Sequence, residues 1–364
     1  MLYKAGFSYC CIRSLENDWY IHNEFESCLQ AIKAETDKYN NVILYGFSMG
    51  SYGALRSAKY LCANRVIVMA PISNIHPECD KRWISDYSHL LNGRSEESLK
   101  PVFLPETDIF IVFDRNGPDV RHVEYISTHK KLRTINVERA GHMVFQMLNS
   151  SGILGKVARG LMQKNVDVDS IQNLINKSKK HSPKYISELS KALDKHKKLR
   201  FKLLNYAVSK FPEDNTLKLD LAGSTAEFGD VLGAANIIRS VVLRTGSAMS
   251  VPVIRALVRY AESGGGDFEV SDLVSVYESS QGRSREVQLL YSRYLRHVKR
   301  YDDAFRAHEF FMKGGPFSSQ GFFERGLIFE ELKLPYMAKK CYYKALEEDK
   351  TFSRAKVRIN KLEE

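Results

Sequence analysis

The fold of the first half of the chain is decided by residues 42–55, VILYGFSMGSYGAL. An apolar run of strand length leads directly into Gly46-Phe47-Ser48-Met49-Gly50, and a segment of small residues with helical character follows. A sharp strand-to-helix turn holds its serine in strained backbone geometry, so the residues two positions on either side must lack bulk. The pattern therefore predicts a serine hydroxyl presented beside the N–H groups of a helix N-terminus. The alternative is a glycine-rich turn that only packs a helix onto a sheet.

Four further runs in the first 150 residues have the length and composition of buried strands. They are FSYCCI at 7–12, RVIVMA at 65–70, DIFIVF at 108–113 and LRTINV at 132–137. Amphipathic segments of helical period separate them. This alternation predicts an α/β domain over residues 1–155, with a parallel sheet of about five strands covered by helices on both faces.

From about residue 156 to 364 the pattern becomes almost wholly helical. Ala304 and Ala338 occupy equivalent places in two similar segments 34 residues apart, which is the period of tetratricopeptide repeats. This half resembles a degenerate tetratricopeptide-like array of helix pairs, and residues 255–290 fit that repeat poorly. The alternative is a plain helical bundle.

The strand, the G-x-S-x-G turn and the small-residue helix together resemble the α/β-hydrolase family. The resemblance implies that Ser48 is the nucleophile and that His142, in a Gly-His pair just past the last predicted strand, is the general base. The acid is expected after the preceding strand, where Asp119 is favoured over Asp114. The order Ser, Asp, His along the chain is the hydrolase order. For His142 the alternative is a surface histidine that caps a helix.

The resemblance also implies an oxyanion hole, of which only the backbone N–H of Met49 can be assigned. The family's second donor comes from a loop in a segment that precedes the equivalent of residues 7–12, and this sequence does not contain it. Three explanations stay open: residues 14–20 substitute, the start is truncated, or catalysis is crippled. Within those residues Asn17, Trp19 and Tyr20 follow the first predicted strand and are candidates for substrate binding, with core packing as the alternative for the aromatic pair.

Composition limits the classes of partner and the cellular settings that fit this sequence. Residues 1–150 carry 17 Lys and Arg against 17 Asp and Glu, so the entire net charge of +11 lies in the helical half. Lys-rich helix faces are most often solvated surface, which argues against nucleic acid as a partner. No apolar run is long enough for a membrane helix, and no export signal is present at the first residues. The six cysteines show no C-x-x-C spacing and predict buried thiols in a reducing, cytoplasmic setting.

No metal-ligand spacing, P-loop or G-x-G-x-x-G motif occurs, so neither a metal nor another cofactor is implied. The sequence as a whole predicts a serine esterase or deacylase joined to repeats that recruit a protein partner. Its resemblance to bacterial hydrolase-like proteins that accompany glycan handling implies an acylated glycan as one possible substrate besides a small acyl ester. The rival hypothesis is a catalytically inactive hydrolase-fold scaffold whose repeats do the binding.

Overall fold

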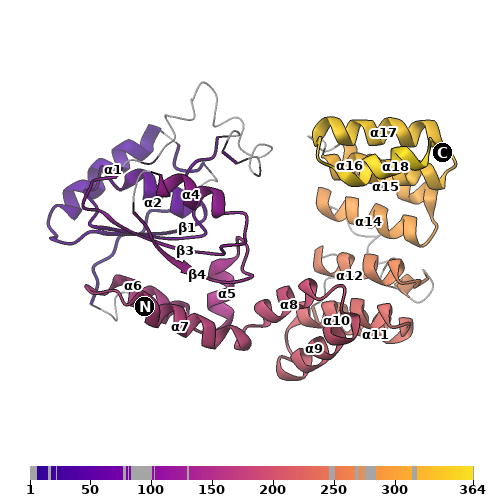
Figure 1. Ribbon diagram of the computed structural model, residues 1–364, viewed down its shortest axis with the longest axis horizontal. Coiled ribbons are helices and arrows are strands. Elements are labelled where there is room, and N and C mark those ends of the chain that lie inside the picture. The colour runs from indigo at the N-terminus through magenta and orange to yellow at the C-terminus, as the bar shows by residue number, and fades with distance from the viewer. Residues whose placement is uncertain are drawn as a thin grey trace. The chain divides into compact units, whose positions relative to one another are not determined.

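The chain forms two compact units, Met1–Leu189 and Ser190–Glu364 (Figure 1). The computed structural model describes residues 6–14, 18–21, 23–76, 79–80, 82, 101, 103–128, 131–245, 251–266, 270–272, 274, 284–313 and 318–363. The first unit is α/β and the second is helical.

A four-stranded parallel sheet forms the centre of the first unit. Its strands are β1 Ile43–Phe47, β2 Arg65–Met69, β3 Asp108–Phe113 and β4 Arg133–Asn136, and they lie side by side in chain order. The first residues of adjacent strands lie opposite each other: Ile43 pairs with Arg65, and Arg65 pairs with Asp108. The parallel sheet is thus confirmed, and all four strands end at the same edge.

Helices cover both faces of this sheet. Side chains along each strand point alternately to the two faces, so each strand contributes to two buried clusters. On β3, Ile109, Ile111 and Phe113 join a buried cluster with α2 (Met49–Ser57) and α4 (Val120–Ser127). Phe110 and Val112 join the opposite cluster with α5 (Val144–Ser150), α6 (Leu154–Met162) and α7 (Val168–Ser178). The continuous apolar run of β3 is what burial on two faces requires.

The first unit extends beyond the expected boundary at residue 155. Helix α7 is tied to β4 because the Gln172 side chain accepts from the N–H of Asn136 and donates to its carbonyl, at 2.8 and 2.9 Å. Arg65 of β2 donates to the carbonyl of Leu161 at the end of α6, at 2.9 Å. These contacts place α6 and α7 with the sheet, and the division falls at 189/190 within α8 (Pro183–Ala192).

Two expectations for the first unit are wrong. Residues 7–12 form no strand, and Tyr9 is 63% exposed, because strand propensity is realised only where a side chain finds neighbours to pack on.

Cys10, Cys11, Cys28 and Cys62 are exposed, whereas Cys341 is buried as expected. Cys28 lies on the outer side of α1 (Asn23–Thr36), so the helical spacing of its neighbours did not reveal which way it faces.

The second unit is an array of helices that repeats every 34 residues or nearly so. The helices are α9 Lys197–Lys210, α10 Asn215–Glu227, α11 Val231–Thr245, α12 Val251–Glu262, α14 Arg285–His297, α15 Tyr301–Lys313, α16 Ser319–Glu331, α17 Pro335–Glu348 and α18 Ser353–Lys361. Helices α12, α14, α16 and α18 start 34 residues apart in turn, and α15 and α17 do the same. Consecutive helices α10 and α11, α14 and α15, and α16 and α17 pack as pairs. A tetratricopeptide-like helical repeat is therefore confirmed, and the period holds from α12 to α14, within the stretch expected to fit poorly.

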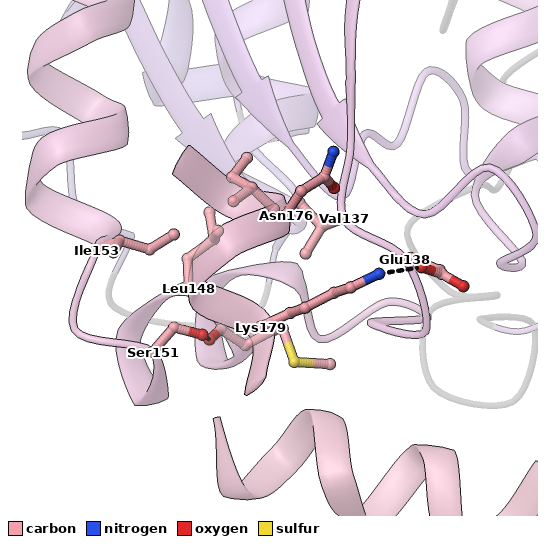
Figure 2. A pocket seen from close by; sticks show the side chains of 9 residues that line it. Val137, Glu138, Leu148, Ser151, Ile153, Asn176 and Lys179 are labelled. Atoms are coloured by element: carbon pink, nitrogen blue, oxygen red, sulfur yellow. Dashed lines mark hydrogen bonds and ion pairs between the residues drawn. The ribbon is translucent and has the colours of Figure 1, made fainter. Parts of the chain in front are cut away.

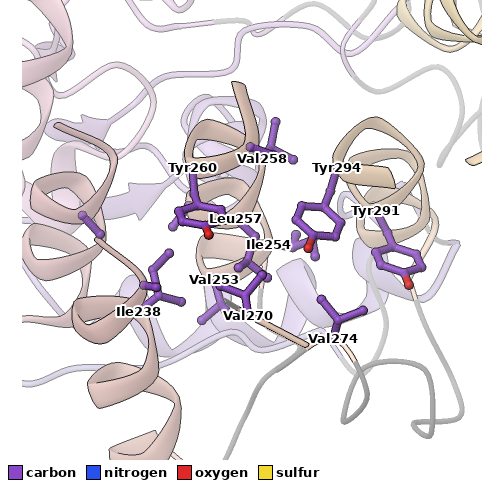
Figure 3. Close-up of a cluster of buried hydrophobic side chains, with 14 of the residues drawn as sticks. Ile238, Val253, Ile254, Leu257, Val258, Tyr260, Val270, Val274, Tyr291 and Tyr294 are labelled. Atoms are coloured by element: carbon purple, nitrogen blue, oxygen red, sulfur yellow. The ribbon is translucent and has the colours of Figure 1, made fainter. Parts of the chain in front are cut away.

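Apolar side chains fill the spaces between successive helices of the array. Figure 3 shows one cluster in which Ile254 and Leu257 of α12 lie close to Tyr294 of α14, and Tyr291 of α14 belongs to the same cluster. Small residues stand where paired helices approach, and both Ala304 and Ala338 are fully buried. Each pair thereby buries a face that it could not bury alone.

A buried histidine makes the second unit sensitive to acid. His308 of α15 is fully buried and its Nε2–H donates to the carbonyl of Gly321 at 2.9 Å, while burial lowers its pKa to about 4. Between its ordinary pKa of about 6.5 and the lowered value of about 4, His308 is protonated in the unfolded chain but neutral in the folded chain. The free energy of unfolding therefore falls as the pH drops through this range. We expect a loss of about 2 kcal/mol from this residue between pH 7 and pH 5, measured by urea unfolding. His308→Gln keeps an N–H donor and should show a correspondingly smaller loss; an equal loss in both proteins would contradict this assignment.

Candidate active site

A strained turn holds Ser48 directly after β1. Its φ of 49° and ψ of −118° lie outside the regions that residues with a side chain normally adopt. A Cβ at Gly46 would lie 2.1 Å from the carbonyl oxygen of Gly50, so the turn requires glycine there. A Cβ at Gly50 would meet nothing within 4 Å, so the expected need for a small residue holds only on the strand side.

The structure brings Ser48, His142 and Asp119 together across the common edge of the sheet. Ser48 Oγ lies 2.8 Å from His142 Nε2, and His142 Nδ1 lies 2.9 and 3.0 Å from the two carboxylate oxygens of Asp119. Because the carboxylate accepts from Nδ1–H, the other ring nitrogen is free to accept the proton of the serine hydroxyl. The carboxylate is 1% exposed and the imidazole 16% exposed, so the chain of contacts runs from the interior to the surface.

Two of these side chains forgo an ordinary structural role. Ser48 and Asp119 stand at the N-caps of α2 and α4, where serine and aspartate usually accept a bond from the helix backbone. Neither side chain makes a capping bond, and both turn to His142 instead. A local rule broken twice around one imidazole is typical of a functional site.

Asp114, the second candidate acid, does not reach His142 but supports the loop that carries it. One carboxylate oxygen accepts from the N–H of Gly141 at 2.9 Å, and the other accepts from the N–H of Asn116 at 3.0 Å. Gly141 has a φ of +54°, a value that glycine adopts without strain. Asp114 therefore fixes the backbone immediately before His142.

Met49 begins α2, so its N–H is among the first-turn donors that have no partner inside the helix. The first turn of α2 contains no acidic side chain, and the positive end of the helix dipole is thus not offset there. The carbonyl of Ser48 accepts from the N–H of Ser51 at 2.8 Å and of Tyr52 at 3.2 Å, which secures the turn. The N–H groups of the first turn of α2 therefore lie next to Ser48, where they favour a negatively charged group.

The two aromatic candidates for substrate binding pack against α2. Trp19 is 2% exposed and lies edge-on to Tyr52, with ring centroids 6.0 Å apart, so core packing describes it better than stacking on a sugar. The Tyr20 ring is half-buried and lies so close to Gly53 that a Cβ there would approach it to 2.6 Å. Both have positive φ, 53° and 54°, which marks a strained turn next to the helix of the site. Asn17 lies outside the described residues.

Three charged or polar residues that the sequence did not single out adjoin the site. Arg82 donates to Asp119 at 2.9 Å and pairs with Asp80 at 2.6 Å, and His122 Nε2 lies 2.9 Å from the same Asp80 carboxylate. Asp80 is fully buried and His122 is 1% exposed. Arg82 and Asp80 fall in the stretch between β2 and β3, and most of residues 77–102 lies outside the described part of the chain.

A small cavity lies between the residues that follow β4 and the helices α5 and α7 (Figure 2). Its volume is about 10 Å³, and Val137, Leu148 and Ile153 line it together with the Glu138–Lys179 ion pair of 2.7 Å. A space of this size holds about one water molecule. It contains none of Ser48, Asp119 and His142 and is a packing defect between helices rather than a substrate site.

Neither a metal site nor a membrane span is found within the described ranges. No group of three or more His, Cys, Asp or Glu side chains there could hold a metal ion. No helix among the described residues is both long and apolar enough to traverse a bilayer.

Two helical-repeat proteins are among the solved structures that are similar to parts of this chain. No protein-family model matches it, and no curated protein matches it. A thermophilic TPR protein from Thermus thermophilus is 15% identical, with 50% of this chain and 98% of that chain covered and a TM-score of 0.41. A tetratricopeptide repeat protein from Parabacteroides merdae is 9% identical, with 62% and 85% covered and a TM-score of 0.42. These similarities give no support to the hydrolase resemblance, which stays a prediction.

Proposed function

We propose that this protein is a serine hydrolase of esterase or deacylase type whose helical repeats bind a protein partner. The observation that carries the proposal is the continuous set of contacts from Ser48 Oγ through His142 to Asp119, at 2.8 and 2.9 Å. Side chains of these three types in this geometry activate a hydroxyl as a nucleophile on unrelated folds. The strained φ of Ser48 adds support, because strain persists at a surface turn where function requires it.

The reaction proposed has two steps. Ser48 Oγ attacks the carbonyl carbon of an acyl ester while His142 Nε2 takes the hydroxyl proton, and the same nitrogen then returns the proton to the leaving alcohol as the ester bond breaks. Water, deprotonated by His142, next attacks the acyl carbon of the acyl-enzyme. As the bond between that carbon and Ser48 Oγ breaks, His142 returns the proton to Oγ, and the acid is released. Asp119 keeps the imidazole in the tautomer that can accept at Nε2 and stabilises the imidazolium. The N–H of Met49, at the start of α2, is the proposed donor to the oxyanion.

Labelling with a fluorophosphonate probe tests this proposal. We expect the probe to react with the full chain at pH 8, and peptide mapping to place the phosphonyl group on Ser48. Ser73 provides an internal comparison because its hydroxyl also lies near a histidine, 3.0 Å from His122 Nδ1, but the residue is 1% exposed. Ser48→Ala should lose the label. A folded wild-type protein that stays unlabelled, or that is labelled at another serine, would overturn the proposal.

The second candidate function is a catalytically inactive scaffold whose repeats bind a protein partner. It is favoured by the repeat architecture, since tetratricopeptide-like repeats commonly mediate protein–protein interaction. Large apolar side chains are also exposed on the second helices of the pairs, with Leu243 of α11 and Tyr336 of α17 each 77% exposed and Phe310 of α15 65% exposed. The labelling experiment separates the two candidates, because a scaffold has no need of a reactive Ser48. An acylated glycan as substrate rests on the resemblance alone.

A further inference from the structure

The carboxylate that faces His142 is also held from behind by a buried network. Arg82 uses one terminal nitrogen on Asp119 Oδ1, at 2.9 Å, and its Nε lies 2.8 Å from Asp80 Oδ2. The guanidinium thus bridges two carboxylates with its planar fork, which a lysine cannot do. Asp119 and Asp80 are both fully buried, so their charges are screened little by water.

The protonation of His122 follows from its partners. Its Nδ1 accepts from the backbone N–H of Ser73 at 3.2 Å, so the proton of the neutral ring sits on Nε2. That Nε2–H donates to Asp80 Oδ2 at 2.9 Å. Burial alone would raise the pKa of Asp80, but the hydrogen bonds from His122 and Arg82 hold it well below its usual range. Asp80 is therefore charged, and His122 is a neutral donor to it.

The network consequently carries one net negative charge. Asp119 and Asp80 each contribute −1, Arg82 contributes +1 and His122 contributes nothing. If Arg82 were the only residue paired with Asp119, its positive charge would cancel the negative charge that stabilises an imidazolium on His142. Asp80 restores it, while the guanidinium fixes the orientation of the Asp119 carboxylate.

We propose that Arg82, Asp80 and His122 are positioning residues of the hydrolase reaction, which lock the Asp119 carboxylate in place and keep the charge behind His142 at −1. The inference rests on the proposed hydrolase function and deepens it. None of the three is a catalytic residue, since they act on His142 through Asp119. The Ser73, His122 and Asp80 side chains repeat the residue types of the candidate active site, but all three are 1% exposed or less, so no substrate reaches them.

Few other charges face His142 within the described part of the chain. Asp119 contacts its Nδ1, Arg82 stands behind Asp119, and Asp114 lies one residue away through its bond to the Gly141 N–H. From β1 the uncharged Phe47 ring faces the imidazole, with centroids 5.9 Å apart. The charges of Arg82 and Asp80 should therefore affect the pH dependence of Ser48 labelling.

The test is the pH dependence of the fluorophosphonate labelling rate, which reports deprotonation of His142 in the free enzyme. Asp80→Asn removes one negative charge at nearly constant shape, so the midpoint of the profile should fall by about one pH unit and the rate above it by about tenfold. Arg82→Met removes the positive charge and should move the midpoint the opposite way. Asp108→Asn, at the far end of β3 and 42% exposed in its side chain, is the charge-matched control and should leave the midpoint in place.

Opposite shifts from two variants cannot come from general damage to the fold, which would slow labelling without that pattern. If one variant fails to fold, as judged by circular dichroism, the midpoint of the other decides. An unchanged midpoint in a folded Asp80→Asn or Arg82→Met protein would overturn the positioning role while leaving the labelled wild type, and with it the proposed hydrolase, intact. An unlabelled wild type would instead remove the hydrolase function itself.

Discussion

Replacing Asp119 by asparagine should slow fluorophosphonate labelling and ester hydrolysis by about 10⁴-fold, the loss recorded for the equivalent change in the chymotrypsin-type triad. The carboxylate accepts from His142 Nδ1 through both oxygens, at 2.9 and 3.0 Å. An asparagine presents an N–H₂ group as well as an oxygen, so it favours the tautomer with its proton on Nε2, and that nitrogen can no longer accept from Ser48. The neutral amide also leaves the imidazolium without its counter-charge.

Asp114→Asn is the matched control for Asp119→Asn. Asp114 is equally an aspartate that follows β3 and is 4% exposed, but it bonds to the backbone N–H groups of Gly141 and Asn116 and not to the imidazole. We expect a reduction of about tenfold or less, through a looser loop before His142. Rates measured for both variants at pH 8, after circular dichroism shows that each is folded, decide the matter. Equal losses in the two variants would remove Asp119 from its role as the acid.

A second large effect is expected in the repeats, where Gly326→Val should destabilise the protein by about 3 kcal/mol. A Cβ at Gly326 would lie 2.3 Å from Cε1 of Tyr342, which belongs to the partner helix α17. The Tyr342 ring cannot move aside, because it is fully buried and its hydroxyl donates to Glu330. Urea unfolding followed by far-UV circular dichroism measures the loss.

A double-mutant cycle shows whether the clash is the cause of that loss. Tyr342→Leu opens space opposite Gly326, so Gly326→Val should cost less than half as much in that background. A cost that is the same in both backgrounds would mean that the Tyr342 ring is not what the new side chain meets. Helix propensity cannot supply the loss, since valine is no worse than glycine in a helix interior.

The sequence allowed the sheet to be predicted because its strands are buried on both faces. The runs at 65–70 and 108–113 agree with β2 and β3 within one residue, since near-continuous apolar character is a strong local signal. Residues 7–12 carry the same signal without the neighbours that a strand needs. Nothing in that hexapeptide indicates whether a sheet edge is available, so propensity alone was misleading.

The candidate site was partly predictable for a related reason. Ser48, Asp119 and His142 each lie within six residues of the end of a strand, and the ends of parallel strands meet at one edge. Choosing Asp119 over Asp114 depended on the hydrolase resemblance, in which the acid lies a few residues into this loop. Their roles as nucleophile, acid and base stay predictions until the labelling and rate measurements are made.

Asp80, Arg82 and His122 could not have been found in this way. His122 sits inside the amphipathic helix α4, and the other two fall in a stretch with no periodic pattern, so their meeting depends on contacts across about 40 residues. A buried ion pair has no local signature in sequence. An aspartate and an arginine two residues apart occur too often in sequences to serve as such a signal.

The constant spacing of the helices bears on how this protein loses its structure. Helices α14 and α16 contact mainly the helices adjacent to them in the array, so structure can be lost there one helix pair at a time. Amide protons should therefore exchange at rates that change from one helix pair to the next, so that this half of the chain melts gradually rather than in a single step.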